Sequence, residues 1–222
     1  GAGPAGLSAA YHLRRLGHQV TIEEAGPLAG GMMRFGIPKY RLPRHIIDAE
    51  VKRITDMGVT LRLNSKVDDI EQAMTDGGFD AAFLAVGAHI AKRAYIPAAG
   101  AAKVLDAVQL LRSMEGEEPP LLGRKVVVYG GGNTAIDVAR TARRLGAEEA
   151  IIVYRRTREK MPAHGFEVEE ALEEGVSMKW LSTIKTIDGG TLQIEKMALD
   201  DKGFPQPTGE FESLDADSLV LA

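Results

Sequence analysis

The sequence predicts an α/β fold in which one strand–turn–helix–strand unit occurs twice. Three observations support it. A glycine motif of the form G-x-G-x-x-G/A begins at Gly1 and again at Gly130, each motif precedes a helical pattern that ends at a glycine, and each helix precedes a short apolar strand. Glycines in this spacing allow a tight turn between a strand and a helix. The sequence therefore predicts two Rossmann-like domains.

The two units superpose when the chain is shifted by 129 positions, from Gly1 to Gly130. The third glycine of the first motif, Gly6, then matches Ala135. The following helices agree through the pairs Ala10/Ala139, Arg14/Arg143, Arg15/Arg144, Leu16/Leu145 and Gly17/Gly146. One glycine motif is a weak signal, because glycine turns are common. Two motifs in register predict two dinucleotide-binding folds.

Each element of the first half has a local reason. Gly17 ends a helix over 7–16, and Pro43, with its fixed φ, opens a helix that stops at Gly58. Alternating or continuous apolar residues predict strands over 20–22, 59–63 and 79–86. We expect these elements to form a first domain over 1–97.

In the second half, residues 98–120 resemble a connector with one short helix over 107–114. The remaining residues predict a second domain over 121–222, with strands over 126–128 and 151–153, helices over 133–145 and 166–174, and a final meander of short strands.

Composition excludes several classes of function. The chain has 222 residues, 45% of them apolar, without the ~20-residue apolar run that a membrane span needs. Its 27 Lys and Arg against 31 Asp and Glu give a net charge of -4, which argues against nucleic acid as the partner. Cys is absent, which excludes redox dithiols and thiolate-bound metals, and the five His residues lack the spacing of metal ligands.

The end of the second strand of each unit distinguishes two ligands. This position reads the adenosine ribose in dinucleotide-binding folds, and it carries Glu24 in the first unit and Arg155, followed by Arg156, in the second. A carboxylate accepts hydrogen bonds from a ribose 2′-hydroxyl, whereas guanidinium groups bind a 2′-phosphate. We therefore expect FAD in the first unit and NADPH in the second. The alternatives are that Arg155 and Arg156 form a solvated basic turn, and that Glu23 takes the role of Glu24.

The candidate cofactor-binding residues follow from these motifs. They are Gly1, Gly3, Pro4, Ala5, Gly6 and Glu24 in the first unit, and Gly130, Gly132, Asn133, Thr134, Ala135, Arg155 and Arg156 in the second. A basic cluster of Arg34, Lys39, Arg41 and Arg44 either holds flavin phosphate or ring oxygens or faces solvent.

This combination resembles the small (beta) subunit of NADPH-dependent glutamate synthase and the related module of dihydropyrimidine dehydrogenase. The residues that carry the resemblance are the first glycine motif, Gly30-Gly31, the stretch 34–43, the turn 84–87, the second glycine motif, and 153–158 with 161–163. It implies that Gly30, Gly31, Arg34, Val86 and Gly87 also contact the flavin, and that the NADPH domain is inserted in a split FAD domain.

The ends of the chain differ from this family. The family has a strand before the first glycine turn, an upstream Cys-rich iron–sulfur domain, and a downstream segment that closes around the flavin. Here the chain begins at Gly1 and stops after 218–222, where the return to the FAD domain should begin. We therefore expect a piece truncated at both ends.

The expected function is a cytoplasmic flavin oxidoreductase of the glutamate synthase small-subunit type. NADPH would pass a hydride to FAD, and electrons would continue to an iron–sulfur domain or a large catalytic subunit. No catalytic side chain is required, because the cofactors carry the chemistry. The alternatives are a nucleotide-binding fragment without turnover, the flavin subunit of another electron-transfer complex, and a flavin monooxygenase, which should lack the stretch 34–43.

Overall fold

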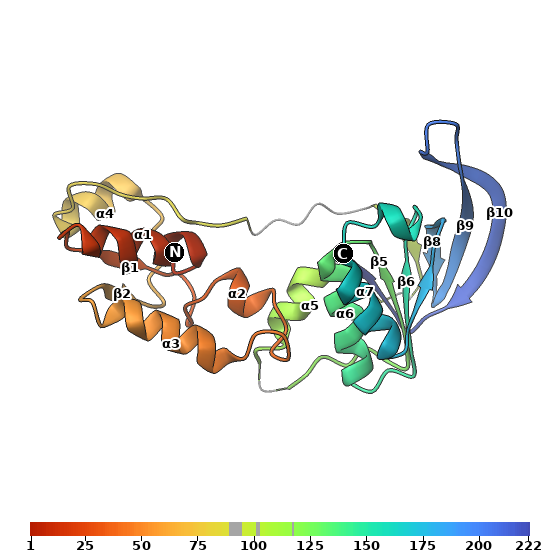
Figure 1. Cartoon of the computed structure of the whole chain (residues 1–222), viewed down its shortest axis with the longest axis horizontal. Helices are drawn as coiled ribbons and strands as arrows, with labels where there is room; N and C mark the ends of the chain where they lie inside the picture. Colours follow the sequence, from red (N-terminus) through yellow and green to blue (C-terminus); the bar gives the residue numbers. More distant parts are fainter. Residues whose placement is uncertain (89–94, 101–102, 117) are drawn as a thin grey trace. The chain divides into compact units, whose positions relative to one another are not determined.

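The computed structural model describes residues 1–88, 95–100, 103–116 and 118–222 (Figure 1). Contacts divide the chain into two compact units, Gly1–Ile90 and Ala91–Ala222. Both units combine helices with parallel strands, so the predicted α/β fold is confirmed.

The first unit consists of a two-stranded parallel sheet and the helices that accompany it. Helix α1 packs on the sheet and on helix α3. The apolar core between them contains Ala2, Leu7, Ala10, Ile22, Ala29, Ile54 and Val59. The elements of this unit are α1 (Pro4–Arg15), β1 (Thr21–Glu23), α2 (Met32–Phe35), α3 (Arg44–Thr55), β2 (Thr60–Arg62) and α4 (Ile70–Gly77).

Both predicted helices of this unit form and end before the expected glycines, although α1 begins at Pro4 rather than at Leu7. Gly17 follows α1 with φ +92°, and Gly58 follows α3 with φ +91°, conformations that glycine adopts readily. Pro43 directly precedes α3 in an extended conformation, with φ -56° and ψ 137°. The strand predicted over 59–63 is β2.

The strand predicted over 79–86 is wrong. The segment has no regular secondary structure, and the side chains of Phe83, Leu84 and Val86 are more than 60% exposed. A strand needs a neighbour that satisfies its backbone N–H and C=O groups, and no strand among the described residues pairs with this segment. Its apolar composition alone therefore does not form the strand.

The second unit is built on a five-stranded parallel sheet in the order β4-β11-β5-β6-β7. Val126, Val127 and Val128 of β5 are fully buried at its centre. The strands are β4 (Val104–Asp106), β5 (Lys125–Tyr129), β6 (Glu149–Val153), β7 (Val176–Lys179) and β11 (Ser218–Leu221). The helices are α5 (Ala107–Ser113), α6 (Asn133–Arg144), the 3₁₀ turn η1 (Arg158–Lys160) and α7 (Gly165–Glu173).

A second sheet gives this unit three layers. It has the order β10-β9-β8-β3, from the strands β3 (Ala98–Ala99), β8 (Ser182–Asp188), β9 (Thr191–Leu199) and β10 (Pro205–Asp215). Figure 1 shows helices α5, α6 and α7 on one side of the parallel sheet and β8, β9 and β10 on the other. The predicted meander is confirmed as β8–β10, which packs Ile184, Ile187, Leu192 and Ile194 against the sheet.

Two predicted boundaries differ from the structure. Residues 98–120, expected to be a connector, instead contribute β3, β4 and α5 to the second unit, although residues 101, 102 and 117 lie outside the described part. Residues 218–221, expected to start the return to the first domain, form β11 between β4 and β5. Both differences depend on pairing between strands that are far apart in the chain, which a local sequence pattern does not specify.

The helices of the described residues are short. The longest, α1, α3 and α6, have 12 residues each. None of them has the length and apolar character to cross a membrane.

Candidate functional site

The first glycine turn packs backbone directly on backbone. A Cβ at Gly1 would lie 2.5 Å from the carbonyl oxygen of Ala85, and a Cβ at Gly6 would collide with the carbonyl oxygen of Gly1. Both positions therefore need glycine for space. Helix α1 begins immediately after the turn, and its N-cap residue Gly3 provides no side-chain hydrogen bond. This open helix N-terminus favours an anionic group.

Gly30 and Gly31 lie against the first turn. The N–H of Gly30 donates to the carbonyl of Ala2 at 2.8 Å. Gly31 has φ +51°, and a Cβ there would lie 2.7 Å from the Cα of Gly3. The structure thus brings these two candidates to the first turn, where both conformation and space require glycine at position 31.

The segment 84–87 also reaches the first turn. Ala85 lies beside Gly1, Val86 is 70% exposed, and Gly87 has φ +74°. The candidates Val86 and Gly87 therefore lie next to the turn, although the strand expected to lead to them does not form.

Glu24 bridges the end of β1 and the first turn. Its Oε2 accepts a 2.7 Å hydrogen bond from the N–H of Ala2, and its Oε1 accepts one of 2.8 Å from the N–H of Gly26. Glu23 instead forms an ion pair with Arg62, at 2.9 Å. Glu24, not Glu23, is therefore the carboxylate at the turn. Each of its oxygens has a further lone pair to offer.

Arg34 is buried rather than open to solvent. Its side chain is 7% exposed, its Nε donates to the carbonyl of Ala29 at 2.6 Å, and its Nη2 forms an ion pair with Asp48. A Cβ at Gly30 would lie 3.1 Å from that of Arg34. The guanidinium thus supports the loop that carries Gly30 and Gly31.

Arg44 makes a similar contribution to the next loop, between α2 and α3. Its Nη1 donates to the carbonyl of Leu42 and its Nη2 to that of Ile37, both at 2.9 Å. Two of the four cations of the basic cluster, Arg34 and Arg44, therefore bind backbone carbonyls of the loops on either side of α2.

The second glycine turn follows β5 at the carboxyl edge of the parallel sheet. The N–H of Gly130 donates to the carbonyl of Val153 on the neighbouring strand at 3.2 Å. A Cβ at Gly132 would have no heavy atom within 4 Å, so the surface above it is open. Gly132 is the N-cap of α6 and provides no side-chain hydrogen bond. The turn thus offers an open helix N-terminus to an anion.

The segment before α7 holds this turn in place. The N–H of Ala163 donates to the carbonyl of Gly131 at 3.0 Å, and the N–H of His164 donates to Oδ1 of Asn133, also at 3.0 Å. Ala135, which replaces the third glycine, is fully buried in the core between α6 and the sheet. Its methyl group fills space there, which explains why alanine fits.

Arg155 and Arg156 follow β6 at the same edge of the sheet, since Val153 pairs with Tyr129 just before the second turn. Among the described residues neither guanidinium has an ion pair, whereas Arg158 pairs with Glu169 at 3.2 Å. Arg155 is exposed, and the Nε of Arg156 is buried without a hydrogen-bond partner in the described part of the chain. The two cations are therefore available to a ligand.

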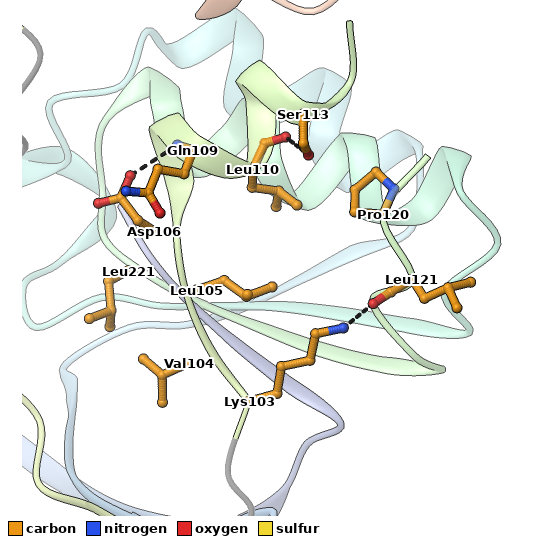
Figure 2. Close-up of a pocket in the computed structure, with 10 residues that line it drawn as sticks. All are labelled: Lys103, Val104, Leu105, Asp106, Gln109, Leu110, Ser113, Pro120, Leu121 and Leu221. Atoms are coloured by element: carbon orange, nitrogen blue, oxygen red, sulfur yellow. Dashed lines mark hydrogen bonds between the residues drawn. The ribbon is translucent and has the colours of Figure 1, made fainter. Parts of the chain in front are cut away.

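A pocket of about 520 Å³ lies elsewhere in the second unit, between β4, α5 and the segment 120–121 (Figure 2). Its lining is largely apolar, and Figure 2 shows Leu105 and Leu110 beside it. Asp106 accepts from the N–H of Gln109 at 3.0 Å and so caps α5. No predicted site residue lines this pocket.

A family model described as pyridine nucleotide-disulphide oxidoreductase matches residues 1–222. The chain belongs to this family. Members of the pyridine nucleotide-disulphide oxidoreductase family are oxidoreductases by that description, which agrees with the expected enzyme class.

Relatives in this family include subunits of larger enzymes. The chain is 46% identical over 185 residues to the NADP(+)-dependent formate dehydrogenase subunit beta of Moorella thermoacetica, covering 82% of this chain and 26% of the relative. It is 34% identical over 224 residues to the glutamate synthase [NADPH] small chain of Escherichia coli, covering 94% of this chain and 48% of the relative. The chain thus spans between a quarter and a half of these proteins.

A solved structure shares the fold. FprA from Mycobacterium tuberculosis in complex with NADPH superposes with a TM-score of 0.78 at 19% identity, covering 100% of this chain and 69% of FprA. This agreement confirms the predicted Rossmann-like α/β fold.

The disulphide in the family name does not describe this chain. It contains no Cys, so a redox dithiol is absent from these 222 residues. What remains from the family description is the pyridine nucleotide and the oxidoreductase chemistry.

Sequence reasoning assigned no role to several residues that shape the site. Tyr154, Ala163 and His164 contact the second turn or the basic segment after it. Tyr154 and Ala163 lie within the stretches 153–158 and 161–163, which carry the family resemblance, so the resemblance could have indicated a role for them. Asp48, the partner of Arg34, had no such signal, because the ion pair depends on how α3 packs.

Proposed function

We propose that this chain is an NADPH-dependent flavin oxidoreductase module of the glutamate synthase small-subunit type. The observation that carries the proposal is the pair Arg155 and Arg156, free of ion pairs with described residues, beside an open glycine turn. When both cofactors are bound, NADPH supplies a hydride, FAD accepts it, and electrons continue to an outside acceptor.

The second unit fits NADPH. The open N-terminus of α6 and the free space above Gly132 suit the pyrophosphate, and Asn133, Thr134 and Ala135 form the first turn of that helix. The guanidinium groups of Arg155 and Arg156 suit a 2′-phosphate, which a carboxylate at the same place would repel. A buried Arg156 Nε without a partner supports a ligand that would accept its hydrogen bond.

The first unit fits FAD. Gly1 and Gly3 form a compact turn, and Pro4, Ala5 and Gly6 form the first helical turn after it. The spare lone pairs of Glu24 suit ribose hydroxyls. Gly30, Gly31 and the 84–87 segment lie against that turn, and Arg34 supports the loop that carries the two glycines. We therefore assign FAD to the unit that was expected over 1–97, and NADPH to the unit that was expected over 121–222. The second unit also includes β4 and α5, which precede residue 121.

The chain's own residues bind and position the cofactors and supply no catalytic acid, base or nucleophile. Hydride transfer between two cofactors requires none of these groups. We place the electron acceptor in an iron–sulfur domain or a large catalytic subunit in the cytoplasm. The names of the two curated relatives describe them as a beta subunit and a small chain, which supports a partner of this kind.

Anaerobic titration of the purified chain tests the proposal. After reconstitution with FAD, NADPH should bleach the visible flavin absorbance, and NADH should do so only at much higher concentration. A colourless preparation that takes up no FAD but binds NADPH would favour a nucleotide-binding fragment. In a separate aerobic assay, rapid substrate-dependent consumption of oxygen would favour a flavin monooxygenase.

A further inference from the structure

Tyr154 directly follows β6 and directly precedes Arg155 and Arg156. Its backbone is fixed on both sides. Its N–H donates to the carbonyl of Lys179 at 2.9 Å, and its carbonyl accepts from the N–H of Ser182 at 3.1 Å. The ring is therefore held at the edge of the sheet where the second glycine turn begins.

The Tyr154 ring packs directly against the second glycine turn. A Cβ at Gly131 would collide with Cε2 and Cδ2 of this ring. The ring also makes an edge-to-face contact with Trp180, with 6.4 Å between centroids and an angle of 84°. Gly131 and Trp180 thus confine the ring between them, which fixes the direction of its hydroxyl.

The hydroxyl of Tyr154 closes the basic segment that follows it. It donates to the carbonyl of Lys160 at 2.8 Å, at the end of η1. The loop closed by this bond contains Arg155, Arg156 and Arg158.

A second tie holds the middle of the same segment. The N–H of Leu181 donates to the carbonyl of Arg156 at 3.1 Å. Leu181 has φ +47°, a conformation that residues with a side chain rarely adopt. The backbone of Arg156 is therefore held by Leu181, and the backbone of Lys160 by the hydroxyl of Tyr154.

These ties matter because the segment concentrates like charge. Arg155, Arg156 and Lys160 have no ion pair with any described residue, and their mutual repulsion favours an open arrangement. Cations that converge on one dianionic phosphate must be held in place before the ligand arrives, since ordering them on binding costs affinity. A hydrogen bond to a backbone carbonyl of the segment provides this without neutralising any of the charges.

We propose that Tyr154 is a positioning residue for the preference for a 2′-phosphate, because its hydroxyl holds the segment 155–160 against the second glycine turn. The inference rests on the proposed function, in which Arg155 and Arg156 bind that phosphate. Tyr154 itself contacts the protein and acts through the arginines.

The test compares Tyr154→Phe with the wild-type chain by calorimetric titration with NADPH and with NADH. Loss of one neutral hydrogen bond should weaken NADPH binding about two- to tenfold. NADH lacks the 2′-phosphate, so its dissociation constant should change by less than about twofold. Trp180 is the one tryptophan of the chain, and an unchanged emission maximum will show that the aromatic contact remains.

Tyr129→Phe is the matched control. The hydroxyl of Tyr129 bonds Oγ1 of Thr183 at 2.7 Å, on the side of the sheet that the meander covers. The control should leave the ratio of the NADPH and NADH dissociation constants unchanged. Equal weakening of both ligands by Tyr154→Phe, or no change in either, overturns the positioning role. A wild-type chain that binds NADH as tightly as NADPH instead refutes the proposed function on which the role depends.

Discussion

Glu24 Oε2 accepts a 2.7 Å hydrogen bond from the backbone N–H of Ala2, which ties the end of β1 to the first glycine turn. The same carboxylate bonds the N–H of Gly26 with its other oxygen. One side chain thus shapes the turn and occupies the position that hydrogen-bonds the adenosine ribose in dinucleotide-binding folds. Its replacement should affect the first unit and leave the second unit unchanged.

We expect Glu24→Ala to retain FAD poorly while its affinity for NADPH stays within about twofold of the wild type. The variant loses the acceptor for the Ala2 N–H and the lone pairs available to ribose hydroxyls. Flavin content after gel filtration and an NADPH titration measure the two effects. Glu23→Ala is the control, because Glu23 pairs with Arg62 away from the turn. Unchanged flavin occupancy in Glu24→Ala would contradict the assignment.

Arg155→Ala should weaken NADPH far more than NADH. Loss of a hydrogen bond to a charged group costs about 1.5–3 kcal/mol, or roughly 10- to 150-fold in affinity. The control is Arg158→Ala, which removes the same charge from a residue already paired with Glu169 and should have a smaller effect. Equal weakening of NADPH and NADH by Arg155→Ala would argue that the 2′-phosphate binds elsewhere.

Gly132→Ala should weaken both nucleotides without affecting the fold. The backbone at Gly132 has φ -89° and ψ 174°, which alanine accepts, and no heavy atom lies within 4 Å of the added Cβ. The methyl group would occupy the space that the pyrophosphate needs. Thermal unfolding should therefore match the wild type, while NADPH and NADH lose affinity by similar factors. Undiminished binding would show that the ligand does not approach this turn.

How much of this site follows from sequence depends on the range of the interactions involved. The glycine turns, the stop of α1 at Gly17 and the start of α3 after Pro43 were predicted, because each depends on the conformational preference of one residue. Glu24 and Arg155 were located because they hold equivalent positions in a repeated unit.

The features that sequence missed are set by distant partners. The strand expected over 79–86 has the right composition but no described strand beside it. The place of β11 between β4 and β5, and the burial of Arg34 against Asp48, also depend on packing between segments far apart in the chain. Local patterns do not encode these relationships.

Gly31→Ala should destabilise the first unit by about 1–3 kcal/mol. Its φ of +51° is unfavourable for alanine, and the new Cβ would lie 2.7 Å from the Cα of Gly3. Gly17→Ala separates backbone strain from the steric clash. Gly17 has φ +92°, so alanine is strained there too, but no heavy atom lies within 4 Å of an added Cβ. Denaturant unfolding should show a larger loss for Gly31→Ala. Equal losses would mean that backbone strain alone is responsible.

Glu174 links α7 to α6 and gives stability a pH dependence. Its Oε1 lies 2.7 Å from Nη2 of Arg140, whose side chain is 7% exposed, and 2.7 Å from Nη2 of Arg144. The hydrogen bond from Arg140, followed by that from Arg144, holds the pKa of Glu174 below its usual value of 4.5. Because the folded-state pKa is depressed, the stabilisation is complete above the unfolded value and is lost as pH falls through the folded one.

Glu174→Gln should therefore lower the free energy of unfolding by about 1–2 kcal/mol near neutral pH. The difference from the wild type should persist down to the usual pKa of 4.5 and then shrink as the carboxylate of the folded wild type takes up a proton. Denaturant unfolding at steps from about pH 7 to about pH 3 measures this. Glu173→Gln makes the same charge change at an exposed neighbour and should show little effect. A difference that stays constant into acid would mean that the amide disturbs packing between α6 and α7, because lost ion pairing disappears once the wild-type carboxylate is neutral.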